Sequence, residues 1–339
     1  MRPLQHALAT SCATIAIAGC SGSPSAASTD GGAVVGATAN DSGRDDATTI
    51  DVGQVGDAFN DVVAEVDAAE TPGTCTPTTT FGGGETERSG GFLATAKIVD
   101  EAGAPVVGQP VFICGIDICS APSVTSASGT VSISSTLPMK KPALKFGDSL
   151  SYAELAIPLT TATTDFTAGG TAVLTTAKLA GKPGAALTAG GAAISGDVTI
   201  AVPSGASVGI DLLVYATADE QLLRAINIPV ASDGPILASS GVTGFQLLYG
   251  LAPAETPVCP AATVTVALPH AHQSPNDFGW TAGTKVEFWI MTIDTGQTYA
   301  PYAGWAKMSD GTVSADATAV STDPGQGFDF LESFAIRLK

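Results

Sequence analysis

The sequence predicts an all-β protein with two consecutive antiparallel β-sandwich domains after a disordered N-terminal tether. From Phe92 onward, apolar and small residues alternate in short runs separated by Gly- and Pro-containing turns, which is typical of half-buried sandwich strands. The chain of 339 residues also holds 39 Gly and 21 Pro, and only 14% of its residues are charged. This composition favours many turns and few long surface helices.

The first half of the folded region contains a regular series of predicted strands. Turn sequences interrupt the series, for example at Asp100–Gly103 and Ser126–Gly129. The predicted strands lie within Leu93–Val99, Pro110–Ile113, Val124–Ser134, Leu150–Leu159 and Ala172–Leu179.

Two Gly-rich segments, Ala180–Gly184 and Thr188–Gly191, mark a boundary before the second half. Beyond them, a strand, a Pro203–Ala206 turn and a second strand over Ile210–Tyr215 are predicted. Further strands are expected within Phe245–Pro269, Thr284–Met291 and Ser333–Leu338, and no repeat of fixed period is evident.

Two blocks resemble known sandwich families. The arrangement AKIVDEAGAPVVGQPVFIC followed by SVTSASGTVSISS, within Gly91–Leu179, resembles the carboxypeptidase-regulatory-like, transthyretin-like modules of bacterial surface proteins. The segments DVTIAVPSGASVGIDLLVYA and FQLLYGLAPAETPVCPAATVTVALP resemble the ZU5 type of sandwich. The first resemblance implies a spacer or binding module without catalytic residues. Together they imply a first domain over residues 75–180 and a ZU5-like domain with a C-terminal extension over residues 186–339.

The first 19 residues have the features of an export signal. Arg2 gives a small positive region, Ala7–Ala18 is short and weakly apolar, and Ile17-Ala18-Gly19-Cys20 follows. This last run resembles the lipobox of bacterial lipoproteins, which implies acylation of Cys20, cleavage before it and, with Ser21 next, outer-membrane sorting. The alternative is an ordinary secretory peptide, since Ala16-Ile17-Ala18 also fits cleavage before Gly19 and release of a soluble protein.

Residues 20–74 are predicted to be the lipidated Cys20 followed by a disordered acidic linker. Ser, Ala, Gly, Thr and Asp dominate the segment, and Arg44 is its one basic residue. Too few large apolar groups are present to offset the entropy of ordering, and like charges favour an extended chain. The linker is expected to hold the folded part away from the membrane.

Four cysteines remain after Cys12 and Cys20 are set aside. Cys75, Cys114, Cys119 and Cys259 allow three pairings in an oxidising compartment. A hairpin loop can close the short span from Cys114 to Cys119, so this disulfide is favoured, and Cys75–Cys259 follows by elimination. The spacing matches no zinc pattern, and no metal is expected.

Motifs for catalysis are weak. His270 and His272 are the only histidines after the leader, and flanking prolines place them in a loop. The string Gly205-Ala206-Ser207-Val208-Gly209 matches G-x-S-x-G, but the strand expected after it favours a hairpin turn over a nucleophile elbow. Turns such as Asp233-Gly234 and Asp294-Thr295-Gly296 are better explained by turn propensity than by calcium. No cofactor fingerprint occurs.

All three tryptophans fall within a short stretch near the C-terminus. Period-two alternation over Val286–Ile290 directs Val286, Phe288 and Ile290 inward and Trp289 outward with Glu287. An outward aromatic cluster can stack sugar rings or a partner's apolar side chains. The candidate platform comprises Trp280, Trp289, Tyr302 and Trp305, and the alternative is that these rings fill the core.

These observations predict a non-enzymatic cell-envelope lipoprotein that serves adhesion, ligand binding or structure. Its expected partners are a membrane, through the lipid anchor, and a glycan or surface protein. The net charge of −18, without a basic stripe, excludes nucleic acid as a favourable partner. Two alternatives stay open: an envelope hydrolase that uses paired carboxylates, and a secreted spacer without a ligand.

Overall fold

The computed structural model describes residues 87–88, 91–148, 150–159, 163–165, 172–179, 184–230, 242–268, 279–293 and 302–339. These residues are all-β, as predicted, and contain no α-helix. None of their segments is a helix long and apolar enough to cross a membrane. The predicted leader, Cys20 and the acidic linker lie outside the described residues.

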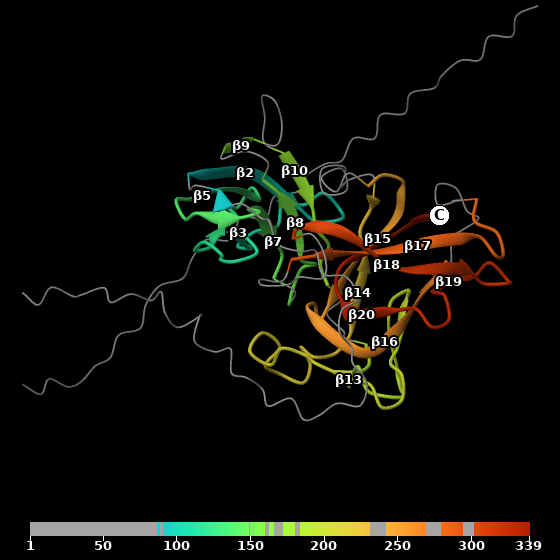
Figure 1. The fold of residues 1–339 in the computed structure, drawn as a ribbon. Coiled ribbons are helices and arrows are strands. Elements are labelled where there is room, and N and C mark those ends of the chain that lie inside the picture. The colour runs from blue at the N-terminus through green and yellow to red at the C-terminus, as the bar shows by residue number, and fades with distance from the viewer. Residues whose placement is uncertain are drawn as a thin grey trace, which may run out of the picture. The chain divides into compact units, whose positions relative to one another are not determined.

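The N-terminal half contains two facing four-stranded sheets and a small two-stranded one (Figure 1). One sheet has the order β10-β2-β5, with β9 also paired to β2, and the other has the order β4-β3-β7-β8. Most pairs are antiparallel, but β9 and β10 both run parallel to β2. The strands are β1 (Glu87–Arg88), β2 (Phe92–Val99), β3 (Pro110–Cys114), β4 (Ser123–Val124), β5 (Thr130–Ser135), β6 (Met139–Lys140), β7 (Ala143–Phe146), β8 (Leu155–Pro158), β9 (Thr163–Asp165) and β10 (Ala172–Thr175).

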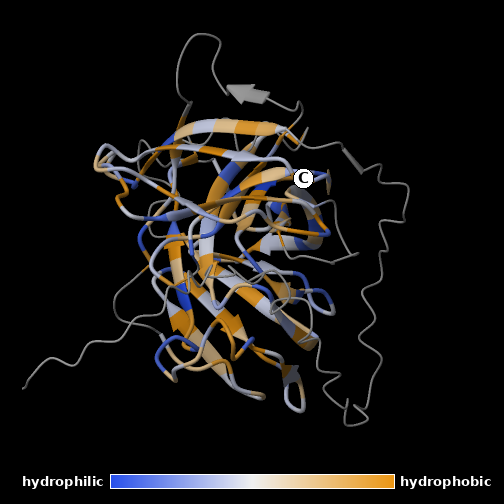
Figure 2. Ribbon diagram, turned by 90° about the vertical axis from the view of Figure 1, so that its left-hand side faces the viewer, coloured by the Kyte–Doolittle hydropathy of each residue, from blue (hydrophilic) through white to orange (hydrophobic). Residues whose placement is uncertain are grey.

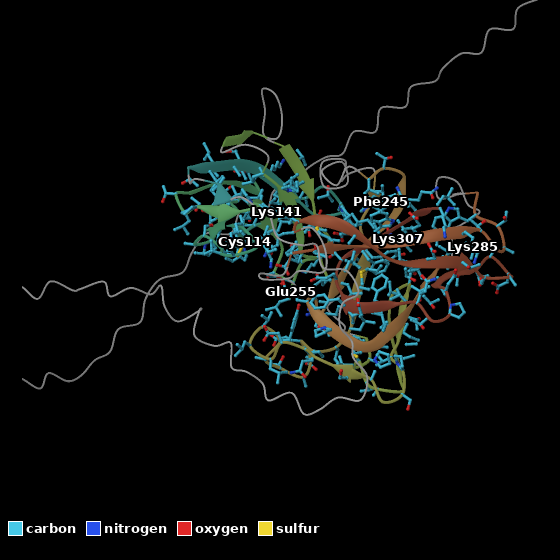
Figure 3. The ribbon with its side chains drawn as sticks, in the orientation of Figure 1. Cys114, Lys141, Phe245, Glu255, Lys285 and Lys307 are labelled. Atoms are coloured by element: carbon cyan, nitrogen blue, oxygen red, sulfur yellow. A yellow bond between two sulfur atoms is a disulfide. The ribbon has the colours of Figure 1, made fainter. Side chains whose placement is uncertain are left out.

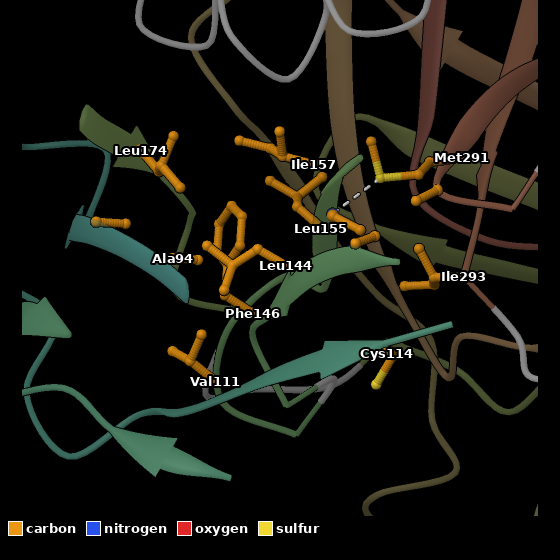
Figure 4. Packing of buried hydrophobic residues seen from close by; sticks show 14 of the residues in the cluster. Ala94, Val111, Cys114, Leu144, Phe146, Leu155, Ile157, Leu174, Met291 and Ile293 are labelled. Atoms are coloured by element: carbon orange, nitrogen blue, oxygen red, sulfur yellow. Dashed lines mark hydrogen bonds between the residues drawn. The ribbon is translucent and has the colours of Figure 1, made fainter. Parts of the chain in front are cut away.

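Period-two alternation explains how these sheets form a core. In β2 the buried residues Phe92, Ala94, Ala96 and Ile98 alternate with more exposed ones. Strands β3, β5 and β7 add further buried aliphatic and aromatic side chains, including Val111, Leu144 and Phe146 (Figure 4).

The C-terminal half forms one eleven-stranded sheet in which every pair is antiparallel. Its order is β11-β12-β16-β19-β18-β17-β21-β15-β14, and β13 and β20 also pair with β16. The strands are β11 (Ala192–Ser195), β12 (Val198–Ala201), β13 (Ser207–Val208), β14 (Arg224–Asn227), β15 (Phe245–Ala252), β16 (Thr256–Ala267), β17 (Lys285–Thr292), β18 (Gly304–Val313), β19 (Ala319–Thr322), β20 (Phe328–Leu331) and β21 (Phe334–Leu338).

The sheet encloses a second core. Phe288, Phe328 and Phe334 pack against one another, with ring centroids 5.6 to 6.4 Å apart. Apolar and polar residues alternate along these strands in Figure 2, which matches one face buried and one face toward solvent.

The two halves share the first core. Met291, Trp305 and Ala335 of the C-terminal sheet belong to the same buried cluster as Phe146 and Leu155 of the N-terminal half (Figure 4). The backbone N–H of Ala156 donates to the Met291 sulfur at 3.2 Å. The domain boundary predicted between residues 180 and 186 stays a prediction. In the structure, side chains from both sides of it pack in one core.

The disulfide predicted between Cys114 and Cys119 is present, and it confirms that interpretation of the short spacing. The two Cα atoms are 4.0 Å apart, and Cys114 is buried while Cys119 is exposed. Cys259 is also disulfide-bonded. Its predicted partner, Cys75, lies outside the described residues.

Candidate functional site

Ser207 does not lie in a nucleophile elbow. It begins β13, which pairs with β16 so that Ser207 lies opposite Cys259. The preceding turn is closed by the Ala206 N–H donating to the Pro203 carbonyl at 3.2 Å, and Gly205 has the positive φ of 76° that such a turn uses. A nucleophile elbow holds its serine at a strand-to-helix turn, whereas Ser207 lies within the two-residue strand β13, so the G-x-S-x-G string is no elbow. The hairpin predicted here is not formed either, because β13 pairs with β16 and no strand covers Ile210–Tyr215.

Other polar motifs offer little chemistry within the described segments. These segments contain no group of three or more His, Cys, Asp or Glu that could hold a metal ion. His270, His272, Asp233-Gly234 and Asp294-Thr295-Gly296 lie outside them.

Three members of the predicted aromatic platform are buried. Trp280 has an exposed fraction of 0%, Tyr302 of 3% and Trp305 of 5%. The indole N–H of Trp280 donates to the Gln246 side chain at 3.1 Å, and Trp305 packs on Phe245. These three rings fill the core and present no stacking face.

Trp289 is the half-exposed member. The outward direction predicted for it with Glu287 is confirmed by the alternating burial of β17. Its indole N–H donates to Glu287 at 3.2 Å, and the guanidinium of Arg337 lies 4.8 Å from the ring centroid. Phe245 contacts the ring edge-to-face at 6.2 Å. A sugar would therefore have to displace Arg337 before it could stack on that face.

An ionic network surrounds Trp289. Glu287 bonds Arg337 at 2.7 Å and Lys307 at 3.2 Å, and Asp310 bonds Lys307 at 2.6 Å. Burial acts to raise the pKa of Glu287, but hydrogen bonds from Arg337, Lys307 and Trp289 outweigh it and hold the pKa below its ordinary value. This paired arrangement orders the sheet face and provides no acid poised to donate a proton.

An open depression of about 750 Å³ lies beside this network. Its lining includes Lys285, Thr312 and Asp323, and the Lys285 ammonium is 3.2 Å from the Asp323 carboxylate. The charged groups of the depression neutralise each other and gather no catalytic constellation.

Two carboxylates, the buried Glu154 and the partly exposed Glu255, converge on Lys145 where the halves meet. The Lys145 ammonium is 2.7 Å from the Glu154 carboxylate and 3.2 Å from the Glu255 carboxylate. Glu255 is labelled in Figure 3. The Ser333 hydroxyl donates to the Glu154 carbonyl at 2.9 Å. A hydrolase would need two acids facing a cleft, but these acids are both paired with one cation, the Lys145 ammonium. The cluster therefore stabilises the junction.

The most unusual surface feature lies within Ile210–Tyr215. The prediction of a strand there is wrong, because the chain turns and exposes three successive aliphatic residues. The exposed fractions are 63% for Leu212, 79% for Leu213 and 43% for Val214. Elsewhere in the described chain, exposed large aliphatic residues occur singly along the sequence. We call Leu212, Leu213 and Val214 the aliphatic knuckle.

Local hydrogen bonds explain why the knuckle is a turn. The Leu213 N–H donates to the Asp211 carboxylate at 2.7 Å, and the Tyr215 N–H donates to the Asp211 carbonyl at 2.8 Å. Such Asp-centred bonds compete with strand pairing. Tyr215 is buried, and its hydroxyl accepts from the Ala254 N–H at 2.7 Å. The knuckle is thus held at its base while its side chains face outward.

Comparison with known proteins adds no relative: no family model, no curated protein and no solved structure matches the chain. The apolar character of the knuckle was read from the sequence as a strand over Ile210–Tyr215. The one signal for exposure was Asp211, a residue that favours turns, just ahead of the run.

Proposed function

We propose that this chain is a non-enzymatic cell-envelope lipoprotein, anchored through Cys20, whose folded part acts as a contact module for adhesion or ligand binding. The aliphatic knuckle is the observation that carries the contact role. Exposed apolar groups that fold stability does not require are typical of interaction surfaces.

The anchor rests on the sequence. The lipobox-like Ile17-Ala18-Gly19-Cys20 and the acidic, Ser- and Gly-rich segment after it favour a tethered protein over a released one. Export agrees with the Cys114–Cys119 disulfide, since disulfides persist in oxidising compartments.

Acylation is tested in bacteria that express the full chain and take up an alkyne-tagged palmitate. Wild type and Cys12→Ser, which removes the other cysteine of the leader, are expected to carry the label and to sediment with membranes. Cys20→Ser is expected to lose the label and leave the membrane fraction. Label retained in Cys20→Ser, or absent from wild type, would contradict the anchor and favour a secreted protein.

A further inference from the structure

We propose that the Cys114–Cys119 disulfide is an exchange site for small thiols. An external thiol attacks the sulfur of Cys119, and Cys114 is the sulfur that leaves and later closes the bond again. The ligand class is a low-molecular-weight thiol such as glutathione. This inference goes beyond the proposed function and does not depend on the anchor at Cys20.

The two cysteines differ in their access to solvent. Cys114 ends β3 with an exposed fraction of 0% and packs in the first core, where Figure 4 labels it. Cys119 is exposed. Because the rate of thiol–disulfide exchange depends on access to the sulfur that is attacked, a dissolved thiol reacts at Cys119.

Backbone hydrogen bonds hold the two cysteines opposite each other independently of the disulfide. The pair forms an antiparallel bridge, and the Gly115 N–H donates to the Ile118 carbonyl at 2.7 Å. On the other side of the pair, the Ser120 N–H donates to the Ile113 carbonyl at 2.8 Å, and the Ile113 N–H donates to the Ser120 hydroxyl at 3.1 Å. None of these bonds involves a sulfur, so the turn keeps its shape when the disulfide opens.

The turn is also fixed to the neighbouring strand β6. The Ile116 N–H donates to the Lys140 carbonyl at 3.0 Å, and the Lys140 N–H donates to the Asp117 carboxylate at 2.9 Å. A Cβ on Gly115 would lie 2.5 Å from the same Lys140 carbonyl oxygen, so the turn packs closely on β6. The freed thiol of Cys114 therefore stays beside Cys119, and this proximity favours closure of the bond again.

The exchange is balanced in atoms and electrons. The external thiolate forms a bond to the Cys119 sulfur, the bond between the two cysteines breaks, and Cys114 leaves as a thiolate that takes a proton from water. In the reverse step, the Cys114 thiolate attacks the Cys119 sulfur and expels the small thiol. If a second small thiol attacks the mixed disulfide instead, both cysteines end reduced and the two small thiols leave as one oxidised disulfide.

The test treats the full chain, purified without reductant and kept folded, with reduced glutathione and then blocks free thiols with N-ethylmaleimide. Peptide mass mapping locates each group. Glutathione is expected on Cys119 and maleimide on Cys114. Glutathione on Cys114, or equal amounts on both cysteines, would overturn the proposal. A disulfide that opens only after urea has unfolded the protein would also overturn it.

Two matched variants measure the difference in access directly when each reacts with oxidised glutathione. Cys114→Ser leaves the exposed thiol, and Cys119→Ser leaves the buried one. The first is expected to form its glutathione adduct roughly tenfold faster or more. Tryptophan fluorescence checks that both variants are folded, and equal rates in two folded variants would contradict the proposed roles.

Closure of the bond is tested on the reduced wild-type protein after the small thiol has been removed. The reduced protein is expected to keep the tryptophan fluorescence of the folded state and to form the Cys114–Cys119 bond again when oxidised glutathione is added. A folded protein that accumulates glutathione on Cys119 without forming the bond would overturn the role given to Cys114.

Discussion

Lys145 shows how single residues bind the two halves together. It lies on β7, its side chain is 16% exposed, and it bonds Glu154 beside β8 and Glu255 between β15 and β16. Glu255 has a positive φ of 55°, which is uncommon for a residue with a side chain and is tolerated where surrounding contacts require it. The cluster therefore fixes the β15–β16 turn against the N-terminal half.

Replacing Lys145 with Met is expected to destabilise the protein by roughly 1 to 3 kcal/mol, because the buried Glu154 and the partly exposed Glu255 lose their counter-charge. Urea unfolding measures the change. Lys178→Met removes an exposed lysine and is expected to change stability by less than about 0.5 kcal/mol. Equal effects of the two substitutions would contradict a structural role for the cluster.

The ion pairs of Lys145 also predict how the stability of the protein depends on pH. Burial acts to lower the pKa of Lys145, but Glu154 and Glu255 outweigh it and raise the pKa well above its ordinary value of 10.5. Because the pKa of Lys145 is raised in the folded state, its protonated form stabilises the fold. This contribution to the free energy of unfolding is complete below pH 10.5 and is lost as pH rises through the folded-state pKa. The difference in unfolding free energy between wild type and Lys145→Met should therefore stay constant up to about pH 10 and shrink above it.

At the scale of elements, period-two alternation predicted strands where one face is buried and the other is polar. Leu93–Val99, Pro110–Ile113 and Thr284–Met291 correspond closely to β2, β3 and β17. Strand β18 was not predicted, because Lys, Ser, Asp and Gly interrupt the apolar residues of its sequence GWAKMSDGTV. The strand is ordered by pairing with β17 and β19 on either side. Local pattern cannot reveal pairing with strands that are distant in sequence.

The strand predicted over Ile210–Tyr215, where the knuckle lies, was wrong for a related reason. Its apolar run satisfies a strand pattern, but the Asp211 bonds and the contact from Tyr215 to Ala254, 39 residues away, make it a turn. The burial of Trp280, Tyr302 and Trp305 likewise depends on which sheet faces meet. The patterns that predict export, a linker and the Cys114–Cys119 disulfide lie in short stretches of sequence, whereas the exposure of a site depends on tertiary packing.

The hairpin-like loop closed by Cys114–Cys119 gives an element-scale prediction. Cross-linking so short a loop restricts the unfolded chain modestly, so Cys114→Ala/Cys119→Ala is expected to cost about 2 kcal/mol. Thermal unfolding with and without reductant measures it, and the reductant should no longer affect the variant at this site. A loss of stability near zero would contradict this prediction and show that packing alone holds β3 and the turn after it.

At the scale of the whole molecule, the shared core predicts cooperative unfolding of both halves. Gly250 of β15 lies so close to Ala153 that a Cβ on it would be 2.1 Å from the Ala153 Cβ. Gly250→Val is expected to force the halves apart and to destabilise both by about 1 to 3 kcal/mol. Tryptophan fluorescence reports the C-terminal sheet, and amide exchange in β2 and β5 reports the other half. Separate midpoints in the wild-type protein would contradict a shared core.

For the whole molecule, the two proposals to be tested are the lipid anchor at Cys20 and a disulfide between Cys75 and Cys259. The pairing of Cys259 tests them most directly, because its partner is one of Cys12, Cys20 or Cys75 if the bond lies within one chain. Peptide mass mapping of the protein from cell membranes, without reduction, identifies the linked peptides. We predict a Cys75–Cys259 peptide and an acylated Cys20 at the N-terminus. A Cys20–Cys259 peptide would leave no thiol for lipid and would contradict both proposals.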